Sequence, residues 1–228
     1  MTATLVLVCK RPRPGEGKQR LVARLGIEAT YLVAQALLDC ALEDALSWQG
    51  PVVIAPATDN DASWAAGLLT TVPHVTICPQ TPGNLGQRLN ALDTTLRQNG
   101  MTSLVFIGSD APLLNDADYA DCLAALQGYQ TVLKPAVDGG VVMMASHLPW
   151  PPLDKLPWST NRLGEALLNC CQHFRQTIGT LPTGADVDQP QDIAGLCLQL
   201  KNDPRPARRR LFALACALTK TNDLDACR

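Results

Sequence analysis

Long apolar runs and paired cysteines are both missing from this sequence of 228 residues. A membrane helix needs about 20 apolar residues, and no run approaches that length. The apolar start, Ala3 to Cys9, is too short for a signal peptide, and its basic residues follow it. The nine cysteines form no C-x-x-C pair, which disfavours a disulfide framework or a zinc knuckle. We therefore expect a cytoplasmic protein without a transmembrane segment.

Aromatic residues and net charge are also scarce. The chain has three Phe, four Trp and three Tyr, and 21 acidic against 19 basic side chains. Proteins bind single-stranded nucleic acids through aromatic stacking and duplexes through clustered cations, so we expect no nucleic-acid partner. Neither G-x-S-x-G nor H-E-x-x-H occurs, and the three histidines lie in no motif. Hydrolases built on those motifs are therefore not expected, nor is histidine acid–base chemistry.

Short β-rich runs alternate with helical patterns, which is typical of a mainly parallel sheet flanked by helices. The expected strands span residues 4–9, 51–55, 75–78, 103–108, 131–133, 141–145 and 177–181. The expected helices include a long one through residues 38–46, then 61–70, 84–98, one capped by Asn115, 161–173, one ending near residue 200, and 205–220. We expect one domain over residues 1–200 and a peripheral helical segment over residues 201–228.

A basic loop follows the first expected strand: from Lys10 to Arg24 there are six basic residues and one Glu. Such a loop, entering a helix and containing two glycines, suits phosphate binding, although its spacing fits neither a Walker loop nor a dinucleotide fingerprint. The alternative is a solvated basic loop. Ligands of open parallel sheets bind beyond the carboxyl ends of strands. We therefore expect this loop to share one cleft with the loops at 79–88 and 109–112.

Two aspartates are candidate metal ligands. Asp110 follows the most hydrophobic expected strand, and a carboxylate there can hold Mg²⁺ between the protein and two phosphates. Asp188 precedes an expected helix and could be the second ligand. The alternatives are that Asp110 caps a turn and that Asp188 caps the helix.

A third group of residues could bind an acceptor. Asp138, Gly139 and Gly140 lie between two expected strands, so they form either a hairpin turn or a place where a sugar or acceptor approaches the backbone. Trp158 and Ser159 could frame the acceptor, although a buried tryptophan is equally compatible with the pattern.

Six motifs occur in order along the chain, and together they resemble a known family. They are Lys10-x-Pro12-x-Pro14-Gly15-x-x-Lys18-x-Arg20-Leu21, Gly83-x-Leu85-Gly86-x-Arg88, Ser109-Asp110-x-Pro112, Asp138-Gly139-Gly140, Trp158-Ser159-Thr160 and Asp186-Val187-Asp188-x-Pro190-x-Asp192. The family is that of GT-A-fold, nucleotide-diphospho-sugar transferase-like proteins described as radical-SAM/selenodomain-associated transferases, and the resemblance covers roughly residues 4–197. More distantly, the chain is similar to guanylyltransferases of molybdenum-cofactor and lactyl-phosphate metabolism.

The resemblance implies a Rossmann-like, three-layer α/β/α sandwich with a mostly parallel sheet, and a site that uses Mg²⁺ or Mn²⁺. The implied catalytic residues are Asp110, Lys18 and Asp138, and the implied metal ligands are Asp110 and Asp188. The implied nucleotide and phosphate ligands are Lys10, Pro14, Gly15, Lys18, Arg20, Gly86 and Arg88. The implied acceptor residues are Asp138, Gly139, Gly140, Trp158 and Ser159. The chain departs from the family's pattern at Gln19, where threonine is usual, and at Val141 and Val142, where an aromatic pair is usual.

Three functions remain open on this evidence. The first is a transferase that moves a sugar from a nucleotide-diphospho-sugar to a small-molecule acceptor, with a divalent metal stabilising the diphosphate leaving group. The second is a nucleotidyltransferase that releases pyrophosphate. The third, motivated by the missing aromatic pair, is a non-catalytic nucleotide-binding module. The basic cluster Arg205 to Arg210 lies outside the resemblance and is expected to be a solvated helix face.

Overall fold

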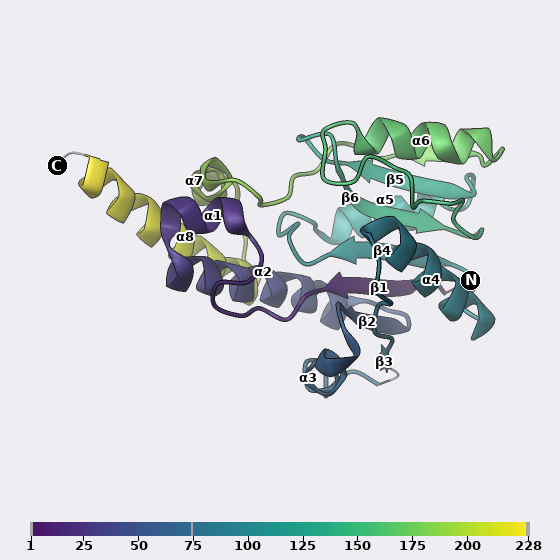
Figure 1. The fold of residues 1–228 in the computed structure, drawn as a ribbon, viewed down its shortest axis with the longest axis horizontal. Coiled ribbons are helices and arrows are strands. Elements are labelled where there is room, and N and C mark those ends of the chain that lie inside the picture. Colours follow the sequence, from purple (N-terminus) through teal and green to yellow (C-terminus); the bar gives the residue numbers. More distant parts are fainter. Residues whose placement is uncertain (1, 74, 227–228) are drawn as a thin grey trace. The chain divides into compact units, whose positions relative to one another are not determined.

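The protein is described by a computed structural model that covers residues 2–73 and 75–226, with side chains up to residue 220. Its described residues form a seven-stranded sheet of order β3-β2-β1-β4-β6-β5-β7 (Figure 1). The strands are β1 (Thr4–Cys9), β2 (Val52–Pro56), β3 (Val75–Ile77), β4 (Leu104–Gly108), β5 (Thr131–Pro135), β6 (Val141–Ser146) and β7 (Ile178–Thr180). Each expected strand is present, with ends that differ by at most two residues.

The strand directions confirm a mostly parallel α/β sheet. Strand β1 runs parallel to β2 on one side and β4 on the other, with Leu7 in register with Ile54 and Ile107. Strand β6 runs antiparallel to both β4 and β5. The reason is local: β5 and β6 are joined through the turn at residues 136–140, and so short a connection can only reverse the chain.

The helices are α1 (Gln19–Leu25), α2 (Ile27–Ser47), α3 (Ala62–Ala66), α4 (Leu85–Gln98), α5 (Asp116–Ala125), α6 (Leu163–His173), α7 (Pro190–Gln199) and α8 (Pro206–Ala226), with a short 3₁₀ helix η1 (Asp59–Asp61). Helix α3 stops at Ala66 rather than near residue 70. Asn115 caps α5 as expected, since its side chain accepts hydrogen bonds from the amides of Ala117 and Asp118.

The backbone groups into two compact units, which we describe separately. Unit 1 comprises Met1–Arg11, Asp44–Gly108 and Leu114–Ala185, and unit 2 comprises Pro12–Glu43, Ser109–Leu113 and Asp186–Arg228. Unit 2 thus assembles three separate segments of the chain, and the domain boundary expected at residue 200 stays a prediction. The last two residues of the expected segment 201–228 lie outside the described residues.

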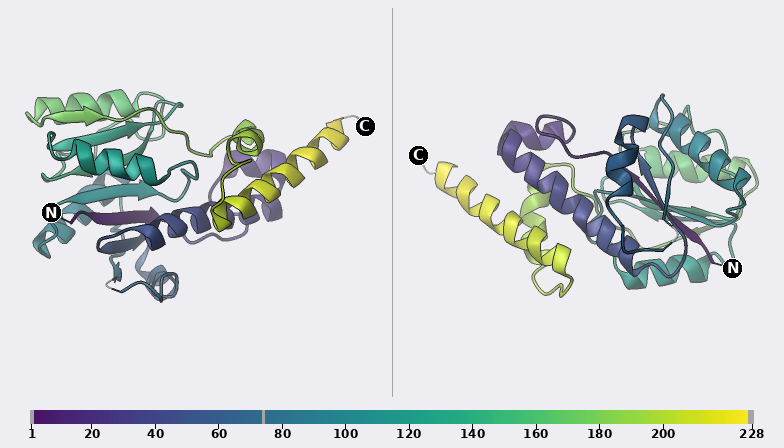
Figure 2. Two further views of the ribbon diagram at one scale, coloured as in Figure 1. Left: turned by 180° about the vertical axis from the view of Figure 1, so that it is seen from behind. Right: turned by 90° about the horizontal axis from the view of Figure 1, so that it is seen from below.

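Unit 1 contains the sheet and has helices on both of its faces. Helices α4 and α6 cover one face, where Leu92, Leu96 and Leu167 pack with Phe106 and Met144 of the sheet (Figure 1). Helix α5 covers the opposite face, as the view from behind shows (Figure 2). This confirms the three-layer α/β/α sandwich.

Unit 2 has a separate apolar core contributed by α1, α2, α7 and α8. Its fully buried side chains include Leu21, Val33 and Leu211. No helix among residues 2–73 and 75–226 is long and apolar enough to cross a membrane.

The prediction that Arg205 to Arg210 form a solvated helix face is wrong at one position. Arg209 and Arg210 are exposed, but the side chain of Arg208 is completely buried. Arg208 precedes Leu211 and Ala215 by three and seven residues, so helical periodicity places it on the face that packs into the core. Its charge is balanced by Glu43, whose Oε2 lies 3.0 Å from Nη1 of Arg208.

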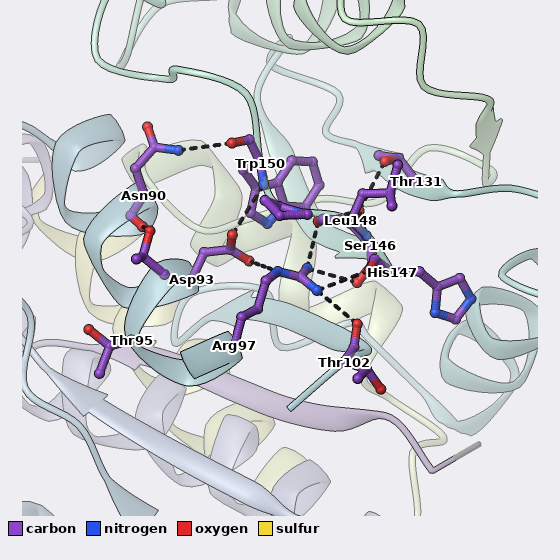
Figure 3. A network of polar contacts seen from close by, with 12 residues as sticks. Asn90, Asp93, Thr95, Arg97, Thr102, Thr131, Ser146, His147, Leu148 and Trp150 are labelled. Atoms are coloured by element: carbon purple, nitrogen blue, oxygen red, sulfur yellow. Dashed lines mark hydrogen bonds and ion pairs between the residues drawn. The ribbon is translucent and has the colours of Figure 1, made fainter. Parts of the chain in front are cut away.

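A second arginine, Arg97, is mostly covered in unit 1, with a side chain 14% exposed (Figure 3). Arg97 Nε donates to Asp93 Oδ1 at 2.9 Å. Its two terminal nitrogens donate to main-chain carbonyls at distances between 2.6 and 3.2 Å, and these carbonyls belong to Thr102, Ser146, His147 and Leu148. The other oxygen of Asp93 accepts from the amide of Trp150. The ion pair therefore joins α4 to the chain that leaves β6.

We predict that Arg97→Met lowers the free energy of unfolding by about 3–5 kcal/mol, because it leaves the buried Asp93 carboxylate and four carbonyls without their donor. Burial already raises the pKa of Asp93, more than the charge of Arg97 and the Trp150 amide lower it. A protonated carboxyl needs no cation, so the loss should be smaller at pH 5 than at pH 7.5. Urea denaturation at both pH values measures the loss in unfolding free energy, with Arg162→Met on the exposed surface as the control. Equal losses for the two variants would contradict the prediction.

Candidate functional site

The basic loop of unit 2 has an unusual backbone where it enters α1. Gly15 and Gly17 have φ values of 77° and 71°, and Lys18, at the N-cap of α1, has φ 43° and ψ 38°. Positive φ values favour glycine, so the backbone conformation alone explains both glycines, and no ligand is needed to account for them. Gln19, which stands where threonine is usual in the resembling family, donates from Nε2 to the carbonyls of Gly15 and Gly17. The loop therefore holds its shape through its own side chains.

Lys18 lies at the centre of a charged cluster in unit 2. Its Nζ donates to Asp110 Oδ2 at 3.1 Å, to Asp188 Oδ1 at 2.8 Å and to the carbonyl of Val187 at 2.6 Å. Arg20 Nη1 lies 3.4 Å from the other oxygen of Asp188. The structure thus brings together four of the residues that the sequence suggested: Lys18, Arg20, Asp110 and Asp188.

Backbone contacts explain how the two carboxylates meet. Asp110 follows β4, and its carbonyl accepts from the amide of Val187 at 2.9 Å. The next residue is Asp188, whose own amide is bound by the side chain of Asp192 at 2.8 Å. Asp192 also accepts from the amide of Gln189 and caps α7, which begins at Pro190. The sequence suggested a capping role for Asp188, but Asp192 has that role and leaves the Asp188 carboxylate for Lys18 and Arg20.

The electrostatics keep Lys18 charged. Burial alone would lower the pKa of its ammonium group, but the charges of Asp110 and Asp188 and their hydrogen bonds raise it above its ordinary value. The Lys18 side chain is 17% exposed, whereas Asp110 is 40% and Asp188 41% exposed. The cluster therefore presents its two carboxylates and the Arg20 guanidinium to solvent, while the Lys18 ammonium is mostly covered.

The donor set of this cluster suits a hard divalent cation. Two carboxylates that share one ammonium are close enough to act together, and Mg²⁺ commonly takes one or two carboxylates and fills its other positions with phosphate and water. Among the described side chains, no group of three or more His, Cys, Asp or Glu could hold a metal ion. A metal here would therefore take its remaining ligands from water or from a bound substrate.

The other implied phosphate ligands belong to other parts of the chain. Pro14 is exposed in the loop of unit 2, while Lys10, Gly86 and Arg88 are in unit 1. Packing accounts for the glycine at position 86, because an added Cβ there would lie 2.1 Å from the carbonyl oxygen of Leu153. Their roles toward phosphate, and the single cleft expected for the three loops, stay predictions.

The guanidinium group of Arg88 is only partly hydrogen-bonded within the protein. Its Nη1 donates to the buried Gln80 at 3.0 Å, but its Nε is buried and has no hydrogen-bond partner among the described residues. Burial lowers the pKa of its guanidinium. Gln80 itself is held by the carbonyl of Ala55, a role that nothing in its sequence context indicated.

The proposed acceptor residues form well-packed local structure. Asp138 Oδ1 accepts from the amide of Gly140 at 2.8 Å, and Gly139 has φ 87° in the turn between β5 and β6. A Cβ on Gly139 would lie 2.0 Å from the carbonyl oxygen of Asn161. These contacts explain the two glycines as a hairpin turn.

Trp158 also has a structural role, and Ser159 has an uncommon backbone. The indole Nε1 of Trp158 donates to the carbonyl of Leu153 at 2.8 Å, and its ring packs against the core of unit 1. Ser159 is exposed and has φ 62°. The acceptor role of Asp138, Gly139, Gly140, Trp158 and Ser159 stays a prediction.

A cavity of about 520 Å³ lies elsewhere in unit 1, between α5 and the end of α2. Asp44, Asp116, Trp48 and Tyr119 contribute to its lining, which includes no lysine, arginine or histidine. Without a cation this lining is unsuited to a phosphate.

The strand order and the charged cluster after β1 and β4 define an α/β protein of the nucleotide-diphospho-sugar transferase fold type. The chain belongs to the family described as "Uncharacterized protein conserved in bacteria (DUF2064)", whose model matches residues 37–160, more than half of the sequence. Among curated proteins, no sequence matches the chain.

Solved structures share this fold. A protein from Desulfovibrio desulfuricans, proposed to be a nucleotide-diphospho-sugar transferase, superimposes with a TM-score of 0.84 at 22% identity, over 97% of this chain and 99% of that one. A cytidylyltransferase from Leptospira borgpetersenii gives 0.53 at 14% identity, over 96% of each chain. A 4-diphosphocytidyl-2C-methyl-D-erythritol synthase from Anaerococcus prevotii gives 0.52 at 10% identity, over 85% of this chain and 96% of that one. These likenesses confirm the expected fold. The resemblance to guanylyltransferases stays a prediction.

We predict that Lys18→Met destabilises the protein by about 1 kcal/mol, because Asp110 and Asp188 then repel each other in a half-exposed setting that solvent screens. Adding Asp110→Asn should restore most of that loss, since the repulsion needs both charges. Urea denaturation of the wild type, Lys18→Met, Asp110→Asn and the double variant completes a double-mutant cycle. Losses that simply add would show that the three side chains are not coupled.

The raised pKa of Lys18 leads to a separate prediction, for how the unfolding free energy changes at alkaline pH. A lysine whose pKa is higher in the folded state contributes stability that is present below the unfolded value and is lost as the pH rises through the folded value. Above pH 10.5, the unfolding free energy of the wild type should therefore fall more steeply than that of Lys18→Met. Parallel curves for the two proteins would contradict the ion-pair geometry.

Proposed function

We propose that the protein is a transferase that binds a nucleotide-diphospho-sugar and transfers the sugar to a small-molecule acceptor. The observation that carries this proposal is the Lys18 cluster, in which an ammonium, a guanidinium and two carboxylates meet where β1 and β4 lead into unit 2. The fold shared with the Desulfovibrio protein supports the proposal.

The residues of the cluster have separable roles. Lys18 and Arg20 would bind the diphosphate, and they would stabilise the negative charge that develops on it when the sugar leaves. Asp110 and Asp188 would hold a divalent cation, Mg²⁺ or Mn²⁺, which when bound supplies further charge neutralisation at the diphosphate. Because Lys18 contacts both carboxylates, it can also hold them in place before the nucleotide arrives. A cytoplasmic location belongs to the same proposal.

A nucleotidyltransferase that releases pyrophosphate is the second candidate. The same cations suit a triphosphate, and the fold is shared with the cytidylyltransferase from Leptospira borgpetersenii. Pyrophosphate exchange, measured with a candidate acceptor phosphate present, distinguishes the two candidates, because only a nucleotidyltransferase returns labelled pyrophosphate to a nucleoside triphosphate by reversing the nucleotidyl transfer.

We predict that a nucleoside diphosphate, triphosphate or diphospho-sugar raises the melting temperature in the presence of Mg²⁺, because a ligand of the folded state stabilises it. Asp110→Asn should abolish the metal-dependent part of the shift, and Asp121→Asn, on the exposed surface of α5, should leave it unchanged. Thermal-shift titration of the three proteins, with and without Mg²⁺, measures this.

Two outcomes would count against the proposal. If no nucleotide shifts the wild type, both transferase candidates lose their basis. If nucleotides bind but no product forms with any acceptor and pyrophosphate exchange is absent, the non-catalytic binding module is favoured.

A further inference from the structure

Arg208 is an arginine with no exposed surface, and its contacts reach the segment that carries Asp110. The Nε of Arg208 donates to the carbonyl of Pro112 at 3.1 Å, and Nη1 donates to the carbonyl of Cys40 and to Glu43. An apolar residue could fill the same volume at a smaller desolvation cost. The burial of a cation at this position is therefore best explained by the hydrogen bonds that Arg208 donates.

The segment from Ser109 to Leu113 has no helix or strand of its own. On the Asp110 side, the amide of Val187 donates to the carbonyl of Asp110. On the Pro112 side, Arg208 donates to the carbonyl two residues further along. These two bonds hold the main chain at Asp110 itself and at Pro112, two residues further along, and they restrict how the segment can move.

Glu43 fixes Arg208 in turn. One carboxylate oxygen of Glu43 accepts from the amide of Ala207 at 2.8 Å, at the start of α8, and the other pairs with Arg208. A single glutamate of α2 thus sets both the position of the helix and the direction of the guanidinium.

We infer that Arg208 is a positioning residue for the Asp110 carboxylate and that α8 is therefore part of the candidate site, although it lies outside residues 37–160 that match the family model. This inference rests on the proposed function, since it concerns the carboxylate that would hold the metal. Residues that orient metal ligands act through such contacts, and their loss typically weakens metal binding by about 10- to 100-fold.

The test compares Arg208→Lys with the wild type, and with Arg209→Lys on the exposed side of α8 as the matched control. Arg208→Lys keeps the charge and is the variant most able to fold, while Arg208→Met removes the charge. Mn²⁺ binding is measured by electron paramagnetic resonance, with Mn²⁺ alone and with inorganic pyrophosphate. Amide hydrogen exchange is measured at Val187 and across α4 of unit 1.

We expect Arg208→Lys to weaken Mn²⁺ binding by about tenfold or more, to speed exchange at Val187, and to leave α4 and the Arg209→Lys protein unchanged. In the Asp110→Asn background, Arg208→Lys should weaken Mn²⁺ binding no further. Wild-type Mn²⁺ affinity in Arg208→Lys, or faster exchange throughout unit 2, would overturn the positioning role. If the wild type binds Mn²⁺ under neither condition, the proposed function fails and the inference falls with it.

Discussion

The ammonium of Lys18 between Asp110 and Asp188 is the interaction on which the candidate site depends. It joins three segments that are far apart in the sequence: the loop after β1, the segment after β4 and the segment before α7. Without a cation, two neighbouring carboxylates would repel each other and the loop would lose its anchor. The raised pKa of Lys18 keeps this cation charged well above neutral pH. A single side chain therefore brings the residues of the candidate site together, and in the proposed function it also binds the diphosphate.

The strands and the charged loop could be predicted because their signals are local. Strand β1 is apolar at every position between its flanking polar residues, and the expected range Thr4–Cys9 matches the structure. The cations and carboxylates of the cluster follow strands, where a parallel sheet exposes its loops. Gly86 and Gly139 illustrate a limit. The resemblance implied Gly86 as a nucleotide ligand, and the sequence left Gly139 as either a turn residue or an acceptor contact. The structure shows close packing of both glycines, against Leu153 and Asn161, and their roles toward a ligand stay predictions.

Arg208 could not be predicted because its burial depends on residues far away in the sequence. Its neighbours Arg205, Arg209 and Arg210 make the segment polar, and a basic run is usually a solvated helix face. What distinguishes Arg208 is its helical phase with Leu211 and a glutamate on α2 that no local pattern connects to it. The role of Gln80 as the partner of Arg88 was missed for the same reason.

Arg208 and Arg97 show why the chain buries arginine where apolar residues would pack more cheaply. Both guanidinium groups bind main-chain carbonyls at places where the chain has left regular structure, after β6 for Arg97 and after β4 for Arg208. A buried carbonyl without a donor costs free energy, and a planar group with five donors can satisfy several at once. Lysine has a single nitrogen and cannot span such a set of acceptors. The two arginines therefore share a geometric role: each binds an irregular segment of the chain, and the segment bound by Arg208 carries Asp110.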